Sequence, residues 1–360
     1  MPDLPLAVSL GDPAGIGPEV LLRSYLRLKD TAQENAPPFF VVGGAQVLAA
    51  AEEHCGIDCS VTVISDPADA ASAFADGLPV LKGRIPEAKG APYTPGRPND
   101  GGAALALHSL AEAARCVISG SASALVTAPV SKGQLGKVGF EFPGQTEFLA
   151  EICGLAPEDA VMMLAGPSLR TVPITVHIAI ADVPAALSAN LIMHKARIVA
   201  AALAQDFGIA RPSLAIAGLN PHSGENGQFG SEEGRIIEPA IAALREEGLD
   251  VTGPVPGDAL FTPRMRPTYD AALCMYHDQA LIPLKALEFD EGVNVTLGLP
   301  IIRTSPDHGT AFDIAGTGKA DPSAMRAAIR MAGECAQARA LARAQASAPT
   351  TAPASSGNNA

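Results

Sequence analysis

The sequence predicts an α/β fold in which a mostly parallel sheet carries helices on both faces. Short apolar, β-branched runs alternate along the chain with longer segments of helical periodicity, which is the pattern of βαβ units. Polar residues and glycines gather where the apolar runs end, as they do at the functional edge of such sheets. At 360 residues, the chain suits one large or two medium units of this type.

The first apolar run, Leu4–Leu10, is followed by Gly11-Asp-Pro-Ala-Gly-Ile-Gly17 and a periodic segment to about Leu28. This order predicts a strand, a glycine-rich turn and a helix, with Pro18 in the first helical turn and Glu19 near the positive helix end. The glycine spacing differs from the dinucleotide fingerprint Gly-x-Gly-x-x-Gly. Two interpretations stay open: the turn presents amide groups to an anion, or it is a tight turn without a ligand.

The alternation continues through the middle of the chain. Strands are predicted at Phe39–Val42, Val61–Ile64 and Ala124–Thr127, and helices from Gly44 to about His54 and from Gly101 to Ala114. Residues 83–100 are rich in Pro and Gly and predict an irregular loop. Thr146 is the predicted N-cap of a helix that runs to about Cys153.

Three later strands end at, or lead to, a histidine. Val172–Val176 ends at His177, Leu214–Ala217 leads to His222, and Ala271–Tyr276 ends at His277, with long helices predicted at 183–207 and 231–247 between them. Because ligands bind outside the carboxyl ends of strands in open α/β sheets, these ends could converge. Three neutral imidazoles would suit Zn²⁺, Co²⁺ or Ni²⁺ better than Mg²⁺, and Asp278 could join them or orient one ring. The alternative is that each histidine is an ordinary packed residue.

Two cations flank the next predicted strand. Lys285 precedes Asn294, and Arg303 closes the run Pro300-Ile-Ile-Arg303. Arginine is suited to bidentate contact with carboxylate or phosphate, and lysine serves as a point charge for phosphate. Asn294 alternates with Val293 and Val295, so its amide points to the opposite face of the strand. If that face is buried, the amide needs a hydrogen-bond partner, which a ligand could supply.

The C-terminal helix is predicted to start with Asp321 as N-cap and Pro322 as the first helical residue, and to run to about Ala342. Residues 344–360 form a predicted disordered tail, because the Ser-, Thr-, Pro- and Ala-rich sequence that fills most of it cannot bury a core.

The composition limits which partners the protein is expected to bind and in which compartment it is expected to lie. A formal charge of −13 argues against nucleic acid, although local cations can still bind a small anion. The six cysteines form no metal pattern and read as free thiols in a reducing compartment. No signal peptide and no run of the ~18 apolar residues that a membrane helix needs is visible, so a cytoplasmic protein is expected.

Five long motifs resemble those of one enzyme family. They are Gly11-Asp-Pro-Ala-Gly-Ile-Gly-Pro-Glu19, Gly218-Leu-Asn-Pro-His222, Met275-Tyr-His-Asp-Gln279, Val293-Asn-Val-Thr-Leu-Gly-Leu-Pro300 and Arg303-Thr-Ser-Pro-Asp-His-Gly-Thr310. From about Leu6 to Arg343 the chain resembles the 4-hydroxythreonine-4-phosphate dehydrogenase family of pyridoxal 5′-phosphate biosynthesis. Asp307–Gly316 and the first glycine turn are also similar to loops of isocitrate and isopropylmalate dehydrogenases.

The resemblance implies a two-domain α/β fold of the isocitrate and isopropylmalate dehydrogenase type. Residues 1–135 plus about 305–343 would form a cofactor-side domain. Residues from about 136 to 304 would form the domain for metal, substrate and dimerisation. The active site would lie in the interdomain cleft at the interface of a homodimer with shared sites.

The resemblance also implies roles for individual residues. The divalent-metal ligands would be His177, His222 and His277, with His277 coming from the partner subunit. The substrate-binding residues would be Gln145, Thr146, Lys285, Asn294 and Arg303. The catalytic residues would be the three histidines, Lys285 and Asp258, and NAD or NADP would bind Asp307, His308, Gly309 and Thr310. The family usually has His where this chain has Gln145, which can donate a hydrogen bond but cannot titrate near neutral pH.

The implied reaction is oxidation of 4-phosphooxy-L-threonine by NAD(P)⁺ with one divalent metal (Zn, Co or Mg) per site. Its product, 2-amino-3-oxo-4-phosphooxybutanoate, would lose CO₂ to give 3-amino-2-oxopropyl phosphate. The alternative is a related dehydrogenase of another small hydroxy acid, such as threonate or erythronate 4-phosphate or a dihydrodiol carboxylate. A third hypothesis is a non-catalytic anion-binding protein of the same fold.

Overall fold

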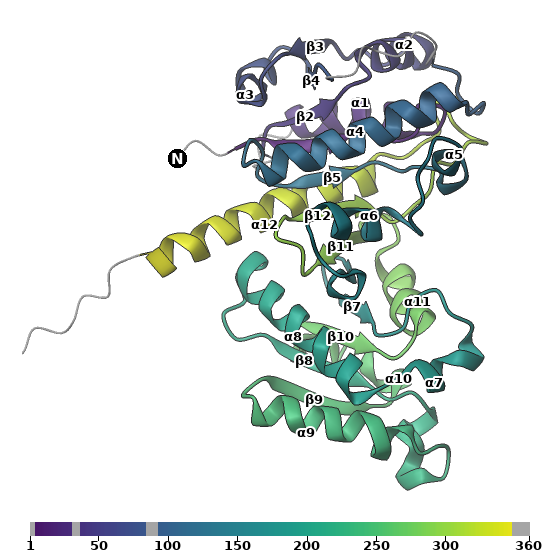
Figure 1. Cartoon of the computed structure of the whole chain (residues 1–360), viewed down its shortest axis with the longest axis vertical. Coiled ribbons are helices and arrows are strands. Elements are labelled where there is room, and N and C mark those ends of the chain that lie inside the picture. Colours follow the sequence, from purple (N-terminus) through teal and green to yellow (C-terminus); the bar gives the residue numbers. More distant parts are fainter. Residues whose placement is uncertain (1–3, 31–36, 84–92, 348–360) are drawn as a thin grey trace, which may run out of the picture.

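The computed structural model describes residues 4–30, 37–83 and 93–347, and twelve strands within these ranges form one sheet. Figure 1 shows the molecule elongated along the direction in which the strands follow one another. In spatial order the strands are β3 (Val61–Ile64), β4 (Leu78–Leu81), β2 (Phe39–Val42), β1 (Leu6–Ser9), β5 (Leu125–Thr127), β12 (Arg303–Pro306), β11 (Val293–Leu297), β6 (Val161–Ala165), β7 (Arg170–Pro173), β10 (Ala271–Cys274), β8 (Ser213–Ala217) and β9 (Asp250–Val255).

The sheet is mostly parallel, as predicted, with an antiparallel insertion at its centre. Strand β11 runs antiparallel to both β12 and β6, and β6 runs antiparallel to β7. The remaining pairings between described strands are parallel. Strand β12 pairs with β5 on one side and β11 on the other, so one continuous sheet passes through both predicted domains.

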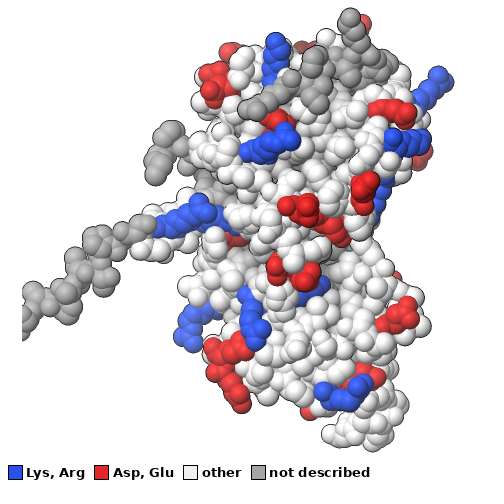
Figure 2. All heavy atoms as spheres, in the orientation of Figure 1, with Lys and Arg blue, Asp and Glu red and all other residues white. Residues whose placement is uncertain are grey.

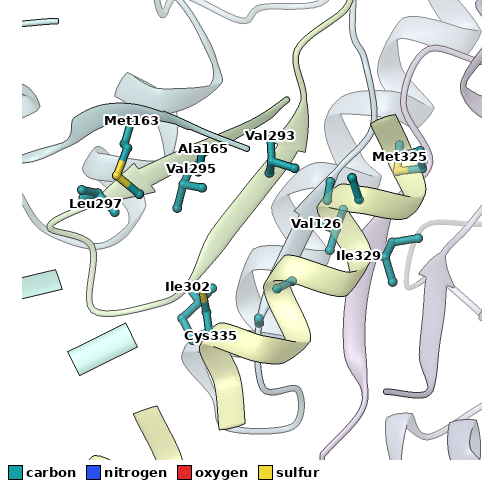
Figure 3. Packing of buried hydrophobic residues seen from close by; sticks show 14 of the residues in the cluster. Val126, Met163, Ala165, Val293, Val295, Leu297, Ile302, Met325, Ile329 and Cys335 are labelled. Atoms are coloured by element: carbon teal, nitrogen blue, oxygen red, sulfur yellow. The ribbon is translucent and has the colours of Figure 1, made fainter. Parts of the chain in front are cut away.

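One face of the sheet carries a single long apolar cluster. It is covered by α1 (Gly17–Asp30), α2 (Ala45–Cys55), α8 (Ala189–Asp206), α9 (Glu238–Glu246) and α12 (Ser323–Ser347). Helix α12 crosses the middle of the sheet, where Met325 and Ile329 pack near Val126 of β5 and Val293 of β11 (Figure 3). This packing joins the N-terminal and C-terminal parts of the chain in one core.

The opposite face carries two separate apolar clusters. Helices α3 (Ala70–Ala73), α4 (Asp100–Ile118) and α6 (Gln145–Ile152) cover the first, and α10 (Gly257–Leu260) and α11 (His277–Glu288) cover the second. Strand β11 lies between them with Val293 and Val295 in the core of the other face, so Asn294 and Thr296 point to this one. Polar side chains are thereby gathered at the centre of this face, between two helical layers.

Several predicted helix boundaries were wrong. The helix expected at 183–207 is two helices, α7 (Val183–Ala186) and α8, because Leu187 is extended and the Ser188 hydroxyl accepts a hydrogen bond from the Leu191 amide. The helix expected at 231–247 begins with a π-helical turn, Glu233–Ile237, before α9. Short 3₁₀ turns lie at Pro67–Asp69, Pro157–Asp159, Ile180–Asp182 and Arg266–Thr268, and α5 spans Lys132–Lys137.

Two predicted caps had different outcomes. Thr146 is not an N-cap: α6 begins one residue earlier, at Gln145, and Gly144 is the capping residue. The Asp321 carboxylate does accept a hydrogen bond from the Ser323 amide at 2.7 Å, as expected for a cap, but α12 begins at Ser323, so Pro322 is not its first residue.

The chain also departs from the predicted strand and tail boundaries. Helix α12 runs to Ser347, so residues 344–347 are helical and do not belong to a disordered tail. Residues 348–360 lie outside the described residues, as do residues 84–92 of the predicted loop. Strands β4, β6 and β9 were not predicted. Strand β4 contains Pro79, a residue that disfavours strands, yet its four residues are buried between β3 and β2.

A buried ion pair fastens α12 to α8. Arg339 donates from Nε and Nη2 to the two carboxylate oxygens of Asp206 at 2.6 and 2.8 Å, and from Nη1 to the Pro300 carbonyl at 2.8 Å. Both ion-pair partners are 8% exposed. Asp206→Asn, which leaves the guanidinium buried without its counter-ion, is expected to lower the free energy of unfolding by about 3–5 kcal/mol.

The exposed pair of Arg197 and Glu247 provides the control for Asp206→Asn, because it has the same bidentate geometry at 2.8 and 2.6 Å. Glu247→Gln is expected to change stability much less, since water solvates and screens the surviving charge. Urea unfolding of both variants measures the difference. Equal losses in the two variants would show that burial does not determine the strength of the Asp206 pair.

Two expectations from composition can be compared with the structure. All six cysteines are free thiols. Among the described helices, none combines the length and apolar character that a membrane span requires. On the face shown in Figure 2, Lys and Arg side chains are interspersed with Asp and Glu.

Candidate active site

A pocket of about 550 Å³, here called the central pocket, lies over β11 and β12 between α6 and α11. It brings together ten of the residues predicted for the site: Gln145, Thr146, His177, His277, Lys285, Asn294, Arg303, Asp307, His308 and Gly309. The polar floor follows from strand alternation, because Asn294 and Arg303 point away from the core on the other face of the sheet.

Arg303 is the most deeply buried cation of the central pocket, with 4% exposure. Its guanidinium donates to the hydroxyl of Thr127 at 2.7 Å, to the hydroxyl of Thr296 at 3.0 Å and to the Gln145 side-chain carbonyl at 3.5 Å. Burial lowers the pKa of Arg303 to about 10, which Glu147 partly counteracts, so the group stays charged at neutral pH. Within the described part of the chain, no carboxylate lies within 4 Å of it. A buried cation held only by neutral oxygens is prepared to bind an anion.

Asn294 has an unused hydrogen-bonding atom in the same pocket. Its Oδ1 is buried and has no hydrogen-bond partner among the described residues. An unpaired buried carbonyl oxygen costs free energy that a donor on a ligand would recover. The condition stated for this amide, that its face of the strand is buried, is met at the side-chain oxygen.

Lys285 and Asp307 connect the predicted substrate residues with the predicted cofactor loop. The Lys285 ammonium lies 2.8 Å from the Asp307 carboxylate. Both side chains remain partly exposed to the pocket, at 39% and 21%. A substrate and a cofactor bound by these residues would therefore be neighbours.

The three histidines follow three adjacent strands. Strand β10 pairs in parallel with β7 and with β8, so the carboxyl ends that lead to His177, His277 and His222 share one edge of the sheet, as predicted. The rings of His177 and His277 lie with their centroids 5.5 Å apart. Burial lowers the pKa of His177, and nearby Lys132 and His277 add to the effect, which favours the neutral imidazole that metals bind.

Asp278 orients His277. The Nδ1 atom of His277 lies 2.7 Å from Oδ1 of Asp278. A carboxylate can only accept, so Nδ1 donates in this hydrogen bond, and in the neutral ring Nε2 is then the nitrogen with a lone pair for another partner. The orienting role considered for Asp278 requires such a hydrogen bond.

His222 does not join the other two imidazoles within one chain. It lines a second pocket of about 600 Å³ together with Asp258, Asp278 and Gln279. In the residues that the structure describes, no group of three His, Cys, Asp or Glu side chains is arranged to hold a metal ion.

The backbone at two of these histidines is strained. His177 and His222 have φ values of 54° and 52°, a region that non-glycine residues seldom occupy. The positive φ continues from His222 through Asn226, which makes a left-handed turn. Such conformations persist only where the surroundings hold them, and they gather at functional sites.

Two side chains that the sequence did not indicate hold this edge in place. The buried Glu233 carboxylate accepts from the amides of Leu219 and Asn220 at 2.9 and 2.8 Å, just before His222. Gln279 accepts from the Met275 amide and donates to the Gly218 carbonyl, which ties the end of β10 to the end of β8. The contacts of Glu233 with the two amides and of Gln279 with Gly218 depend on the topology, so the sequence did not indicate these roles.

The glycine-rich turn packs against the cofactor loop. The Ile16 amide donates to the Thr310 carbonyl at 2.9 Å, and a Cβ at Gly15 would lie only 2.7 Å from that oxygen. The amides of Asp12, Ala14 and Gly15 also have acceptors inside the protein. Of the two interpretations of this turn, close packing is therefore favoured over anion binding. Thr310 acts in this contact and does not line the central pocket.

Comparison with known proteins decides the family. Residues 34–332 match the family model for pyridoxal phosphate biosynthetic protein PdxA. The 4-hydroxythreonine-4-phosphate dehydrogenase of Erythrobacter litoralis (strain HTCC2594) is 61% identical over 335 residues, which are 93% of this chain and 97% of that protein. The chain belongs to the PdxA family. The resemblance seen in the five motifs is confirmed.

Solved structures of related proteins have the same mixed α/β fold. The PdxA-family enzyme 4-hydroxythreonine-4-phosphate dehydrogenase from Klebsiella pneumoniae is 39% identical, with a TM-score of 0.83 over 93% of this chain and 98% of that chain. A terephthalate 1,2-cis-dihydrodiol dehydrogenase from Burkholderia xenovorans LB400 is 29% identical, with a TM-score of 0.63 over 92% of this chain and 98% of that chain.

Proposed function

We propose that this PdxA-family chain oxidises 4-phosphooxy-L-threonine with NAD(P)⁺ as a 4-hydroxythreonine-4-phosphate dehydrogenase. The product would be 2-amino-3-oxo-4-phosphooxybutanoate, a β-keto acid that loses CO₂ to give 3-amino-2-oxopropyl phosphate. The observation that carries the proposal is the central pocket, where a buried arginine without a carboxylate partner lies beside an unpaired amide oxygen. A small substrate with anionic ends and hydrogen-bond donors complements both groups.

Different residues of the central pocket bind different groups of this substrate. Arg303 and Lys285 bind the phosphate and carboxylate ends, and the oxygen of Asn294 accepts from the substrate's ammonium or hydroxyl group. Gln145 lies 3.5 Å from the Arg303 guanidinium and steadies it. Because an amide does not titrate near neutral pH, Gln145 serves in binding and takes no part in proton transfer.

The histidines fit a divalent metal shared between two subunits. His177 is favoured as neutral and the Nε2 of His277 is available, so the donor set suits Zn²⁺ or Co²⁺ better than Mg²⁺. His222 would supply the third imidazole and His277 would come from the partner subunit. When bound, the metal would polarise the substrate hydroxyl and stabilise negative charge on its oxygen. The chain's own contribution is to orient the rings through Asp278 and the strained turns.

Apolar side chains near the histidines support a homodimer at this edge. Ile178, Ile180 and Ile282 are 43%, 73% and 64% exposed, and all three line pockets that contain His177, His277 or His222. Large exposed apolar side chains that gather in one place are typical of a surface that another protein covers. The six free thiols fit a reducing compartment such as the cytoplasm.

NAD(P)⁺ would bind beside the loop Asp307, His308, Gly309 and Thr310 and accept hydride from the substrate carbon. The Lys285–Asp307 ion pair keeps this loop next to the substrate residues. The buried Glu19 accepts from the Gly316 amide at 3.3 Å and holds the far end of the same loop. These contacts position a cofactor without contributing chemistry of their own.

A second candidate function has its own support. The Burkholderia xenovorans relative acts, by its name, on a dihydrodiol of terephthalate, and it has the same fold at 29% identity. A related substrate such as a dihydrodiol carboxylate, or threonate or erythronate 4-phosphate, would use the same cation and metal chemistry. The two candidate functions therefore differ in the size and charge of their substrates.

A substrate panel tests the proposal. NAD(P)H formation is followed with 4-phosphooxy-L-threonine, erythronate 4-phosphate, threonate 4-phosphate and a dihydrodiol carboxylate, on protein whose metal content has been measured. We expect kcat/KM to be highest for 4-phosphooxy-L-threonine. A higher kcat/KM for another member of the panel would identify that compound as the substrate instead. Absence of turnover with all of them would favour a non-catalytic anion-binding protein.

A further inference from the structure

Lys195 is a buried cation that the site as described does not use. Three basic side chains are buried among the described residues: Lys195, Arg303 and Arg339. Arg339 is neutralised by Asp206, whereas the other two line the central pocket and have no carboxylate within 4 Å in the described ranges. Lys195, at 9% exposure, is therefore like Arg303 a buried cation without a carboxylate partner among the described residues.

The position of Lys195 in its helix is unusual for a lysine. Helix α8 buries Ile192, Ala196, Val199 and Leu203, which recur at the spacing of one helical face. Lys195 falls on this apolar face, where a long charged side chain is costly unless its end reaches a polar partner. The lysine stem therefore packs on the apolar face of α8, and its ammonium needs a polar partner beyond that face.

The ammonium reaches the pocket where two strands separate. The β6–β7 ladder includes Leu164 with Thr171 and Ala165 with Arg170, but does not extend to Pro173. The Pro173 carbonyl instead accepts a hydrogen bond from Lys195 Nζ at 3.2 Å. An ammonium has three donors, and this bond uses one of them. The other two remain for a ligand, because Lys195 lines the central pocket together with Val176 and His177, which follow Pro173 in the chain.

We infer that Lys195 is a third substrate-binding cation, which binds an anionic oxygen of the substrate at the end of the pocket next to His177. This inference rests on the proposed function and adds to it a residue that no motif indicated. Burial lowers the pKa of Lys195 to about 8, so the cation persists at neutral pH at a cost in the free protein that a bound anion would offset. Lys285 shares its charge with Asp307, so Lys195 adds to Arg303 a second cation of the pocket that has no carboxylate partner in the described residues.

The alternative is that Lys195 only completes the hydrogen bonding of the Pro173 carbonyl. The two roles differ in what a neutral replacement does. Lys195→Met removes the charge but keeps the length of the stem, and Lys195→Arg keeps the charge. Arg197→Met, two residues along the same helix, removes an exposed charge outside the pocket and is the control.

Steady-state kinetics with 4-phosphooxy-L-threonine and inhibition by inorganic phosphate test the inference. For Lys195→Met we expect KM to rise about 10- to 100-fold with kcat changed little, because one charged hydrogen bond is lost. Lys195→Arg should recover most of the loss, and Arg197→Met should behave as wild type. Weaker inhibition by phosphate in Lys195→Met assigns Lys195 to the phosphate end, and unchanged inhibition assigns it to the carboxylate end.

A KM unchanged in Lys195→Met would overturn the inference and leave Lys195 a structural residue. If that variant does not fold, Lys195→Gln, which can still donate to Pro173, is measured in the same way. Wild type and Arg197→Met test the proposed function independently, since turnover by both with the substrate does not depend on Lys195. If neither turns over, calorimetric binding of inorganic phosphate and, separately, of acetate to wild type and Lys195→Gln decides the inference alone, and equal affinities of the two proteins for both anions would overturn it.

Discussion

His177→Ala and His277→Ala are each expected to lose activity roughly 10³-fold, because loss of a metal ligand removes several kcal/mol of stabilisation from the reacting oxygen. When the two inactive proteins are mixed, unfolded and refolded together, activity should return. In a site shared between subunits, one of the two sites of each mixed dimer has all of its ligands. Random assortment then gives about a quarter of wild-type activity.

The structure makes this experiment informative. His177 and His277 of one chain are neighbours, with ring centroids 5.5 Å apart, but His222 lines the adjacent pocket and no three-ligand group forms in the described residues. A site completed within one chain predicts no recovery in the mixture, since every site would lack one ligand. The control is a mixture of His177→Ala with His222→Ala, which remains inactive if both ligands come from the same chain.

Arg303→Met is expected to lower kcat/KM for 4-phosphooxy-L-threonine by roughly 10²- to 10³-fold, which is typical when one partner of a buried charged contact is removed. The same change should leave the stability of the free protein unchanged or raise it. The reason is that Arg303 is buried at 4% exposure without a close carboxylate, so removing its charge removes a desolvation cost.

Steady-state kinetics and thermal unfolding measure these two opposite effects. Arg211→Met, at an exposed arginine outside the pocket, is the control and should change neither quantity. A large loss of stability in Arg303→Met with unchanged KM would contradict the assignment. It would show that the hydrogen bonds to Thr127 and Thr296 are structural and that the cation binds no substrate.

The order of strands and helices could be predicted where local signals are strong. The β-branched runs and the glycine and proline turns indicated eight of the twelve strands of the sheet; the run Pro300–Arg303 meets β12 only at Arg303, and β4, β6 and β9 were not predicted. The antiparallel placement of β11 could not be predicted, since pairing direction depends on contacts between distant segments. The break before α8 has a local signal, Ser188, but the apolar periodicity on both sides of it concealed the boundary.

Most residues that line the candidate site could be predicted from the sequence, but the side chains that hold them in place mostly could not. Asn294 and Arg303 were identified from charge and strand alternation, and both line the central pocket. Thr127, which accepts two bonds from Arg303, lies 176 positions away and has no pattern of its own. Lys195 could have been noticed as a lysine on the apolar face of a helix, which is a local signal. Glu233 could not, because its role exists only through amides that the fold brings to it.

Metal-dependent oxidation of 4-phosphooxy-L-threonine is tested most directly by measuring NAD(P)H and CO₂ together, before and after bound metal is removed with a chelator. We expect both products to form in equal amounts on metal-loaded protein, both to stop after chelation, and Zn²⁺ or Co²⁺ to restore both. Continued formation of NAD(P)H by protein shown to contain no metal, or no NAD(P)H from the metal-loaded protein, would contradict this expectation.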